Sequence, residues 1–397
     1  MIFTSFAPNI QIDDFWLAVK LLMPWHWPAL RTGKAQKQLA ITIGNHFNQE
    51  CFLFDSGRNA LHQLLQAYNL PSGSEIIIQG FTCSVVPHAI IRTNLVPVYV
   101  DINDQYNINP TDLNAVITPQ TKAIIVQHTF GIPADLNAIS KIAKEHNLIL
   151  IEDLAHSLGA KHNNQEVGTF GDSAILSFGS DKVISASRGG ALITNNKTVI
   201  NTLNNQKFAT SPFKLVLQNL LQPIFFFLAK PIYSFANLGK IILYTGRKLK
   251  LLPTILTNRE KKAQGEVPTY TLANVLARQL LHQWQKLPKF IEHRQKIAIL
   301  YEQTFHQNFP TGTSYLRYPI QTPNPKDLFK KTKQTGIILG DWYTQAIGPK
   351  DADPIQCGYH TNTCPKAEKL SQHIINLPTH IGITAIQAEE IIRIVGN

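Results

Sequence analysis

The feature that most constrains the fold of this chain is an alternation of short apolar runs and helix-like stretches between residues 52 and 200. Runs that are apolar throughout are typical of strands buried on both faces of a parallel sheet, because neither face then meets water. The predicted strands are residues 75–79, 96–100, 123–127, 148–151, 174–178 and 191–194. Residues 58–68 and 134–146 have helical apolar spacing. The pattern predicts an α/β domain with a largely parallel sheet.

Residues 201–270 interrupt this alternation with a hydrophobic insert that Pro223 and Pro231 divide. From Leu272 onward, apolar residues recur at the spacing of a long amphipathic helix, and the rest of the chain is typical of a smaller α+β domain. We therefore expect three parts. They are a large domain with an N-terminal arm at residues 1–200, the insert at 201–270, and a small C-terminal domain at 271–397.

The net charge of +11 would suit nucleic acid, an anionic membrane surface or phosphorylated small molecules. The sequence has no run of five or more basic residues, no RNA-binding signature and no zinc-finger spacing, so we expect no nucleic-acid partner. The four cysteines lack the paired spacing of metal ligands, and we expect no metal site. No signal-peptide pattern precedes the first predicted strand. We therefore expect a cytoplasmic protein with reduced thiols.

Two segments are strongly apolar, but neither contains an uninterrupted apolar stretch as long as a membrane-spanning helix. Residues 15–27 hold three of the five tryptophans, and residues 215–252 include the basic group Arg247, Lys248 and Lys250. Tryptophan beside basic residues is typical of a segment that lies on a membrane surface. The same residues would also suit a dimer contact or a lid over an active site. The sequence slightly favours these last two, and peripheral contact with the cytoplasmic face of a membrane stays open.

Asp153 and Lys182 are the candidate catalytic residues. Each of them follows a predicted strand. The carboxyl ends of parallel strands face the ligand crevice of an α/β sheet. A pyridoxal phosphate (PLP) enzyme needs an amine to hold the cofactor aldehyde as a Schiff base and a carboxylate to keep the ring nitrogen protonated. A lone Lys or Asp is usually a surface or capping residue, but the pair indicates PLP chemistry. His156 would then lie near the ring.

The phosphate of such a cofactor needs an anion site, and Ser56-Gly57-Arg58-Asn59 is a candidate because it opens a predicted helix after an apolar run. Unpaired N–H groups and the helix dipole favour an anion there, and Arg58 adds charge. By itself the segment is an ordinary helix start. Ser177 would donate a further hydroxyl.

Together these residues belong to longer motifs that resemble the DegT/StrS family of PLP-dependent nucleotide-sugar aminotransferases. The motifs are Ser-Gly-Arg-Asn-Ala-Leu at 56–61, Pro-Val-Tyr-Val-Asp-Ile at 97–102, His-Thr-Phe-Gly-Ile-Pro-Ala-Asp at 128–135, Ile-Glu-Asp-Leu-Ala-His-Ser-Leu-Gly-Ala at 151–160 and Gly-Asp-Ser-Ala-Ile-Leu-Ser-Phe-Gly-Ser-Asp-Lys at 171–182. The resemblance resumes at 364–370 and 376–380.

The resemblance implies an aspartate-aminotransferase-like (fold type I) architecture, a homodimer with shared active sites, and a role for each motif residue. Lys182 would be the Schiff-base lysine, Asp153 the partner of the ring nitrogen, and His156 the neighbour of the ring hydroxyl. The cofactor-binding set would be Ser56, Gly57, Arg58, Asn59, Cys83, Asp153, His156, Ser177 and Lys182. Cys83 departs from the family, which usually stacks an aromatic ring on the cofactor there. Thr269 and Thr271 replace an Asn and an Arg.

Two functions follow from these observations. The first is an aminotransferase that moves an amino group from an amino acid, by family likeness glutamate, to a nucleotide-linked keto sugar for surface polysaccharide or glycoconjugate synthesis. The family also contains dehydratases that lack the Schiff-base lysine, and the presence of Lys182 argues against that branch. The second is a catalytically inactive protein of the same fold that acts as a membrane-surface binding or scaffold protein.

Overall fold

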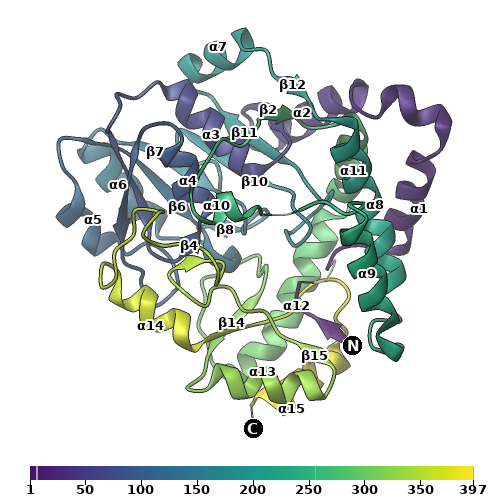
Figure 1. The fold of residues 1–397 in the computed structure, drawn as a ribbon. Helices are drawn as coiled ribbons and strands as arrows, with labels where there is room; N and C mark the ends of the chain where they lie inside the picture. The colour runs from purple at the N-terminus through teal and green to yellow at the C-terminus, as the bar shows by residue number, and fades with distance from the viewer. Residues whose placement is uncertain (6–7, 255, 397) are drawn as a thin grey trace.

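The computed structural model describes residues 1–5, 8–254 and 256–396, and its centre is a nine-stranded sheet with helices on both faces (Figure 1). In β3 (Glu75–Gln79), Ile77 lies in one buried apolar cluster, while Ile76 and Ile78 lie in another. Successive strand residues point to opposite faces, so a strand that is apolar throughout needs a cover on each side. Helix α3 (Gly57–Tyr68) covers one face, and α6 (Leu136–Glu145) covers the other.

The strand order is β12 (Ala209–Thr210), β13 (Tyr270–Thr271), β2 (Glu50–Phe54), β11 (Gly190–Thr194), β10 (Ser173–Ser177), β7 (Ile149–Asp153), β6 (Thr121–Gln127), β3 and β5 (Val96–Val100). From β10 to β5 the neighbouring strands are parallel, whereas β11 is antiparallel to both β10 and β2. The sheet is therefore mixed and mostly parallel, which confirms the predicted fold class.

The predicted strands at 75–79 and 96–100 coincide with β3 and β5, and the other four differ by one or two residues at one or both ends. The most consequential difference is in β7, which continues to Asp153 rather than ending at residue 151. Asp153 is thus part of the sheet, and its position is fixed by the ladder to Gln127 on β6 and Ile175 on β10.

The other helices of the large α/β part are α2 (Lys34–Phe47), α4 (Val85–Ile91), α5 (Pro110–Val116) and α7 (Lys197–Asn205). The short elements are β4 (Thr82–Cys83), η2 (Thr129–Gly131), β8 (Lys161–His162) and β9 (Gln165–Glu166). The amphipathic helix predicted from Leu272 is α11 (Asn274–Trp284), which begins two residues later, and α12 (Leu287–Phe305) follows it. Proline stands in the first turn of α12, a position that suits a new helix start because its missing N–H is not needed there.

The insert forms helices that lie against the N-terminal segment. Its elements are α8 (Phe213–Ala229), η3 (Phe235–Asn237), α9 (Leu238–Lys248) and α10 (Asn258–Lys261). Helix α8 packs against α9, α11 and α1 (Ile12–Leu21), and η1 (Pro24–Ala29) follows α1. Within the described residues, none of the helices has the length and apolar character needed to cross a bilayer.

The C-terminal part contains β14 (Tyr318–Gln321), α13 (Pro325–Gln334), β15 (Ile337–Ile338), β16 (Ile347–Gly348), α14 (Pro365–His373), β17 (Ile374–Leu377) and α15 (Ala385–Val395). Two strand pairings connect it to distant sequence. Strand β1 (Ile2–Phe3) runs parallel to β15, and β16 runs parallel to β4. The second pairing places Gly348 next to Cys83 at the end of β4. The domain boundaries proposed from the sequence stay a prediction.

Candidate active site

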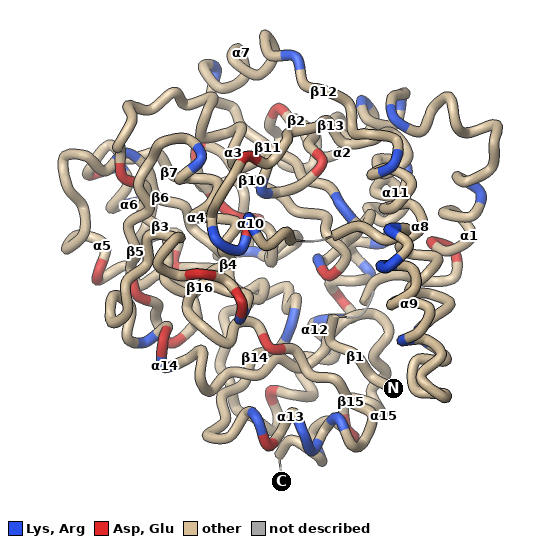
Figure 2. The backbone as a smooth tube through the Cα atoms, viewed as in Figure 1, with Lys and Arg blue, Asp and Glu red and all other residues tan. Residues whose placement is uncertain are grey.

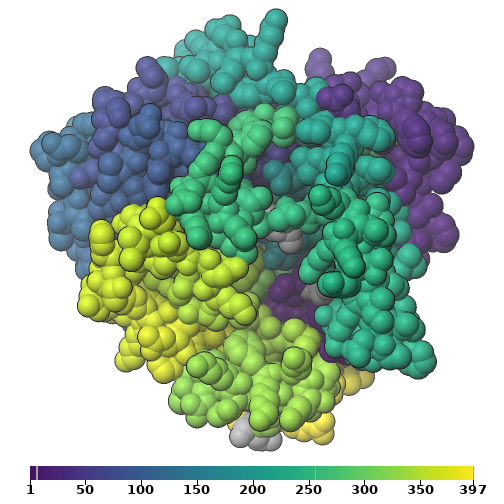
Figure 3. Space-filling view, viewed as in Figure 1, coloured from purple at the N-terminus to yellow at the C-terminus, as the bar shows by residue number. Residues whose placement is uncertain are grey.

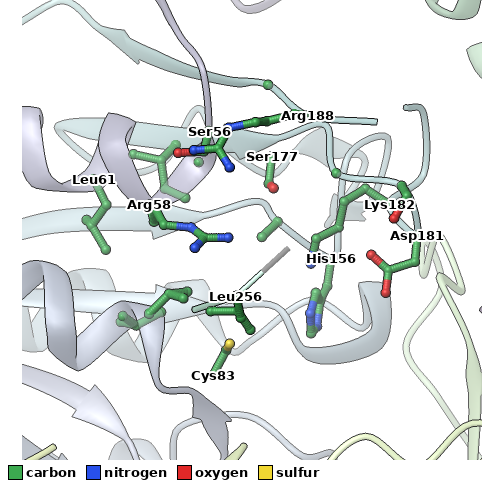
Figure 4. Close-up of a pocket in the computed structure, with 18 of the residues that line it drawn as sticks. Ser56, Arg58, Leu61, Cys83, His156, Ser177, Asp181, Lys182, Arg188 and Leu256 are labelled. Atoms are coloured by element: carbon green, nitrogen blue, oxygen red, sulfur yellow. The ribbon is translucent and has the colours of Figure 1, made fainter. Parts of the chain in front are cut away.

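A cavity of about 250 Å³ lies where β7 and β10 end and α3 begins (Figure 4). It is lined by eight of the nine predicted cofactor-binding residues: Ser56, Gly57, Arg58, Cys83, Asp153, His156, Ser177 and Lys182. The ninth, Asn59, is not brought to the cavity. Its buried amide donates hydrogen bonds to the Asp55 carboxylate (2.8 Å) and the Pro268 carbonyl (3.0 Å).

Asp153 and Lys182 are a carboxylate and an amine held in the same partly dry space. Burial raises the pKa of the Asp153 carboxyl, while the N–H of Ala155, which donates a hydrogen bond to it at 2.8 Å, acts in the opposite direction. Burial also lowers the pKa of the Lys182 amine from its usual 10.5, although nearby Asp181 opposes the shift. Each shift favours the neutral form of its group, so a buried carboxyl and a poorly solvated amine face one cavity.

The start of α3 forms a tight cradle. The Ser56 hydroxyl is buried and has no hydrogen-bond partner among the described residues. A methyl group on Gly190 would lie 2.3 Å from the carbonyl carbon of Ser56, so β11 approaches the cradle as closely as a glycine permits. An unpaired hydroxyl beside a helix N-terminus is suited to a phosphate, and Ser177 lines the same space. These residues fit the phosphate end of PLP.

Two arginines reach this end of the cavity, and both carry carboxylate partners. Arg188 donates two hydrogen bonds to the Asp55 carboxylate, at 3.0 and 2.7 Å. Arg58 forms an ion pair with Glu260, which lies on α10 at the end of the insert. Figure 4 shows Arg58 and Ser177 directed into the same space from different elements. The cradle is therefore positive, and its charge is partly balanced before any ligand binds.

His156 is part of an aromatic stack. Its ring lies parallel to Trp342 at 4.9 Å between centroids and to Phe130 at 6.2 Å. Burial lowers the pKa of His156 well below its usual value, and the charges of Lys182 and Arg317 act in the same direction. The imidazole is therefore neutral near pH 7. Its predicted contact with the cofactor ring stays a prediction.

The sequence reasoning missed Trp342 and Tyr343, which line the cavity opposite the sheet. The guanidinium carbon of Arg317 lies 3.4 Å from the centroid of the Trp342 ring, and the Lys182 amine lies 4.9 Å from it. Cys83 lines the same cavity. Trp342 and Tyr343 therefore give the cavity an aromatic surface, although position 83 itself is not aromatic. No local motif marks these two residues, because the pairing of β16 with β4 positions them.

The insert also contributes to the cavity. Asn219 of α8 and three residues before α10, Pro253, Thr254 and Leu256, are part of its lining. Arg188 was missed as well, although the run Ser-Arg-Gly-Gly ahead of β11 was a local signal for it. The cavity thus has one wall from the ends of sheet strands and another from the insert and the C-terminal part.

A family model described as the DegT/DnrJ/EryC1/StrS aminotransferase family matches residues 24–211 and 254–396. The chain belongs to this family. The resemblance drawn from the motifs is thereby confirmed, as is the predicted enzyme class, a PLP-dependent aminotransferase. The family match leaves out residues 212–253, which contain α8, η3 and α9.

Relatives within the family cover the chain to different extents. A pleiotropic regulatory protein of Geobacillus stearothermophilus is 30% identical over 334 residues, which span 81% of this chain and 78% of that protein. A GDP-perosamine synthase of Escherichia coli O157:H7 is 38% identical over 145 residues, which span 36% of this chain and 40% of the synthase. The second similarity therefore concerns less than half of either protein.

The fold is shared with solved structures. The structure of the Escherichia coli GDP-4-keto-6-deoxy-D-mannose-3-dehydratase with bound hydrated PLP matches with a TM-score of 0.75 at 19% identity. The match covers 99% of this chain and 99% of that chain. The predicted aspartate-aminotransferase-like (fold type I) architecture, with its smaller α+β part, is thereby confirmed.

Proposed function

We propose that this protein uses PLP to transfer an amino group from an amino acid, glutamate, to a nucleotide-linked keto sugar. The observation that carries the proposal is that Lys182 and Asp153 line one cavity with the cradle at Ser56. A dehydratase that lacks the lysine would not need this amine. The names of the relatives support a sugar acceptor, since one is a GDP-perosamine synthase.

Each residue of the cavity has a role that follows from its position. PLP supplies, when bound, an electron sink for a substrate carbanion. Ser56, Ser177 and the first turn of α3 hold its phosphate by donating hydrogen bonds. The Asp153 carboxyl holds the proton of the ring nitrogen, and its burial strengthens that contact because little water competes. The Lys182 amine, whose pKa is lowered by burial, takes up and returns a proton at the substrate carbon.

The decisive experiment replaces Lys182 by Ala and measures amino transfer from glutamate to a panel of nucleotide-linked keto sugars. We expect transfer to fall by about 10²–10⁴-fold, because the group that forms the covalent link and moves the proton is gone. The visible absorbance of the lysine-bound cofactor should disappear as well. Lys144→Ala, at an exposed position on α6, is the matched control. Unchanged transfer and absorbance in Lys182→Ala would contradict the proposal.

The alternative, an inactive membrane-surface protein, predicts that the purified chain neither binds PLP nor transfers amino groups. The cavity favours the enzyme, because a scaffold would not require a buried Asp153 and a poorly solvated Lys182 around one cradle. Amino transfer at any rate that depends on Lys182 excludes the inactive protein.

The homodimer with shared active sites and the cytoplasmic location belong to the same proposal, and family membership supports both. Sedimentation velocity of the purified chain at micromolar concentration tests the dimer directly. A single species at the mass of one chain, with full activity, would contradict it.

A further inference from the structure

The exposed apolar side chains of this protein are concentrated on two segments. Among the described residues, eleven of the seventeen large hydrophobic side chains that are exposed belong to residues 12–27 and 213–249. They are Ile12, Trp16, Trp25, Trp27, Phe213, Leu228, Phe235, Leu238, Ile241, Tyr244 and Leu249. Trp25 and Phe235 keep 70% and 71% of their surface in solvent. Single exposed apolar residues are normal, but such a concentration marks an interaction surface.

The two segments form one continuous surface, which we call the basic apolar face: the exposed side of α1, η1, α8 and α9. Helix α1 packs on α8, and α8 packs on α9. The rings of Phe15 and Phe227 stack at 4.8 Å, and those of Trp27 and Phe213 meet at 6.3 Å. Figure 3 shows the purple N-terminal segment and the teal insert side by side along one edge of the molecule.

The charge of this face is mainly positive. Residues 212–253, which contain α8 and α9, hold six basic residues and no Asp or Glu. The basic residues are Lys214, Lys230, Lys240, Arg247, Lys248 and Lys250. Figure 2 shows blue but no red along α8 and α9. The two acids of α1, Asp13 and Asp14, form ion pairs with Lys286 and therefore offset little of this charge.

Helix α9 shows how the apolar and basic residues are arranged. Leu238, Ile241 and Tyr244 are exposed and recur every three residues, so they form a stripe along the outer side of the helix. The buried residues of the helix, Gly239, Leu243 and Gly246, face the protein. The exposed basic side chains Lys240, Arg247 and Lys248 flank the stripe. Long basic side chains beside an apolar stripe can extend their charges toward phosphates while the stripe leaves water.

We propose that the basic apolar face binds an anionic lipid surface and seats the tryptophans and α9 at the headgroup boundary. Charge complementarity selects this occupant. In a two-fold symmetric contact the same surface meets itself, so a second copy of the chain would bring like charges together. An anionic bilayer instead pairs with the exposed basic residues of the face and accepts the apolar stripe.

Two further observations bear on this proposal. None of the described helices is long and apolar enough to cross a bilayer. Most of the face lies in residues 212–253, which the family match leaves out. The proposal is independent of the aminotransferase reaction and can fail or hold without it.

The test is cosedimentation of the full chain with vesicles. Vesicles containing phosphatidylglycerol should bind the protein, pure phosphatidylcholine vesicles should bind it far more weakly, and added salt should weaken the binding. Reversing two charges in Arg247→Glu/Lys248→Glu should lower affinity by at least about tenfold, since each basic residue near an anionic surface contributes about fivefold. Lys331→Glu/Lys333→Glu makes the same change at exposed positions on α13 and should bind like the wild type.

A second pair of variants tests the apolar contribution. Ile241→Ser/Tyr244→Ser should lower vesicle affinity severalfold, whereas Ile386→Ser, at a position that is 78% exposed on α15, should not. Far-ultraviolet circular dichroism and amino transfer to soluble acceptors confirm that each variant is folded. Equal binding by all variants, or no binding to anionic vesicles, overturns the proposal. If Ile241→Ser/Tyr244→Ser instead dissociates a dimer in sedimentation velocity, the face is a subunit interface.

Discussion

The two walls of the cavity have different origins. The sheet wall consists of Ser56, Asp153, Ser177 and Lys182, which stand where strands end and helices begin. The insert wall consists of Asn219, Pro253, Thr254 and Leu256, which come from one long connection between β12 and β13. The sheet wall has hydroxyl and ionisable groups, whereas the insert wall has two apolar and two uncharged polar side chains.

This difference indicates a division of labour. Groups that act on the cofactor need fixed positions, and strand ends in a buried sheet provide them. Groups that select among acceptors can change between relatives, and connections tolerate such change. We therefore expect variants of the sheet wall to alter cofactor binding and turnover, and variants of the insert wall to alter the KM for the keto sugar.

The largest effect should come from the sheet wall. Asp153→Asn removes the carboxylate that we propose holds the ring proton, while it keeps the shape of the side chain. We expect kcat to fall by about 10²–10³-fold, the usual loss when one preorganised electrostatic contact is removed. Steady-state kinetics with saturating glutamate measure it. A kcat within threefold of the wild type would mean that the carboxylate is not a cofactor contact.

A steric variant tests whether the cradle at Ser56 needs its close approach to β11. The added methyl of Gly190→Ala would lie 2.3 Å from the Ser56 carbonyl carbon, so the cradle must shift. We expect a loss of about 1–3 kcal/mol in the free energy of unfolding and weaker PLP binding. Gly179→Ala is the control, because its nearest contact would be Lys182 Cγ at 3.8 Å. Equal PLP affinity in the two variants would argue against the cradle.

The ion pair between Arg58 and Glu260 joins the two walls and gives a pH dependence. Burial acts to raise the pKa of Glu260, but Arg58 and Thr257 outweigh it and hold the pKa below 4.5. A carboxyl whose pKa is lowered by folding stabilises the fold above about pH 4.5, and this contribution is lost as the pH falls through the lowered value.

Glu260→Gln should therefore destabilise the protein by about 1–3 kcal/mol near pH 7, because it removes a charged hydrogen bond at a buried site. The difference from the wild type should shrink as the pH falls below 4.5. Chemical denaturation at several pH values measures it. A difference that is constant across this range would mean that the pair does not couple the walls.

The smallest effect should come from the insert wall. Leu256→Ala removes an apolar contact at the cavity, and we expect a KM for the keto sugar that rises about tenfold with little change in kcat. Leu249→Ala, which is 63% exposed, should leave both constants unchanged. If kcat of Leu256→Ala fell as far as that of Asp153→Asn, the two walls would not have different roles.

Much of the sheet wall could be predicted from the sequence, because strand ends fix both topology and chemistry. Asp153 ends one apolar run and Lys182 follows another, and such runs are typical of buried strands, so the sequence predicts both residues at one crevice. The position of the Asn59 side chain could not be predicted in this way. Successive helix residues point about 100° apart, so Arg58 reaches the cavity while Asn59 turns toward Asp55.

The rest of the site could not be predicted, because it depends on contacts between distant parts of the chain. Trp342 and Tyr343 reach the cavity through the pairing of β16 with β4, and no periodicity signals that pairing. The sequence of the insert shows that it is apolar, but it does not show what covers the apolar residues. It is therefore compatible with a lid, a dimer contact and a membrane-surface segment. Only the fold separates its parts: the residues before α10 line the cavity, and α9 faces outward.

The parallel pairing of β12 with β13 has a consequence for how such a protein arises. Parallel neighbours cannot be joined by a tight turn, so at least about a dozen residues must leave the sheet edge and return to it. Every ancestor with this pairing therefore already carried a detour outside the sheet. A longer connection adds new surface without changing any hydrogen bond between the strands. An enzyme can in this way acquire a binding surface while it keeps its active site.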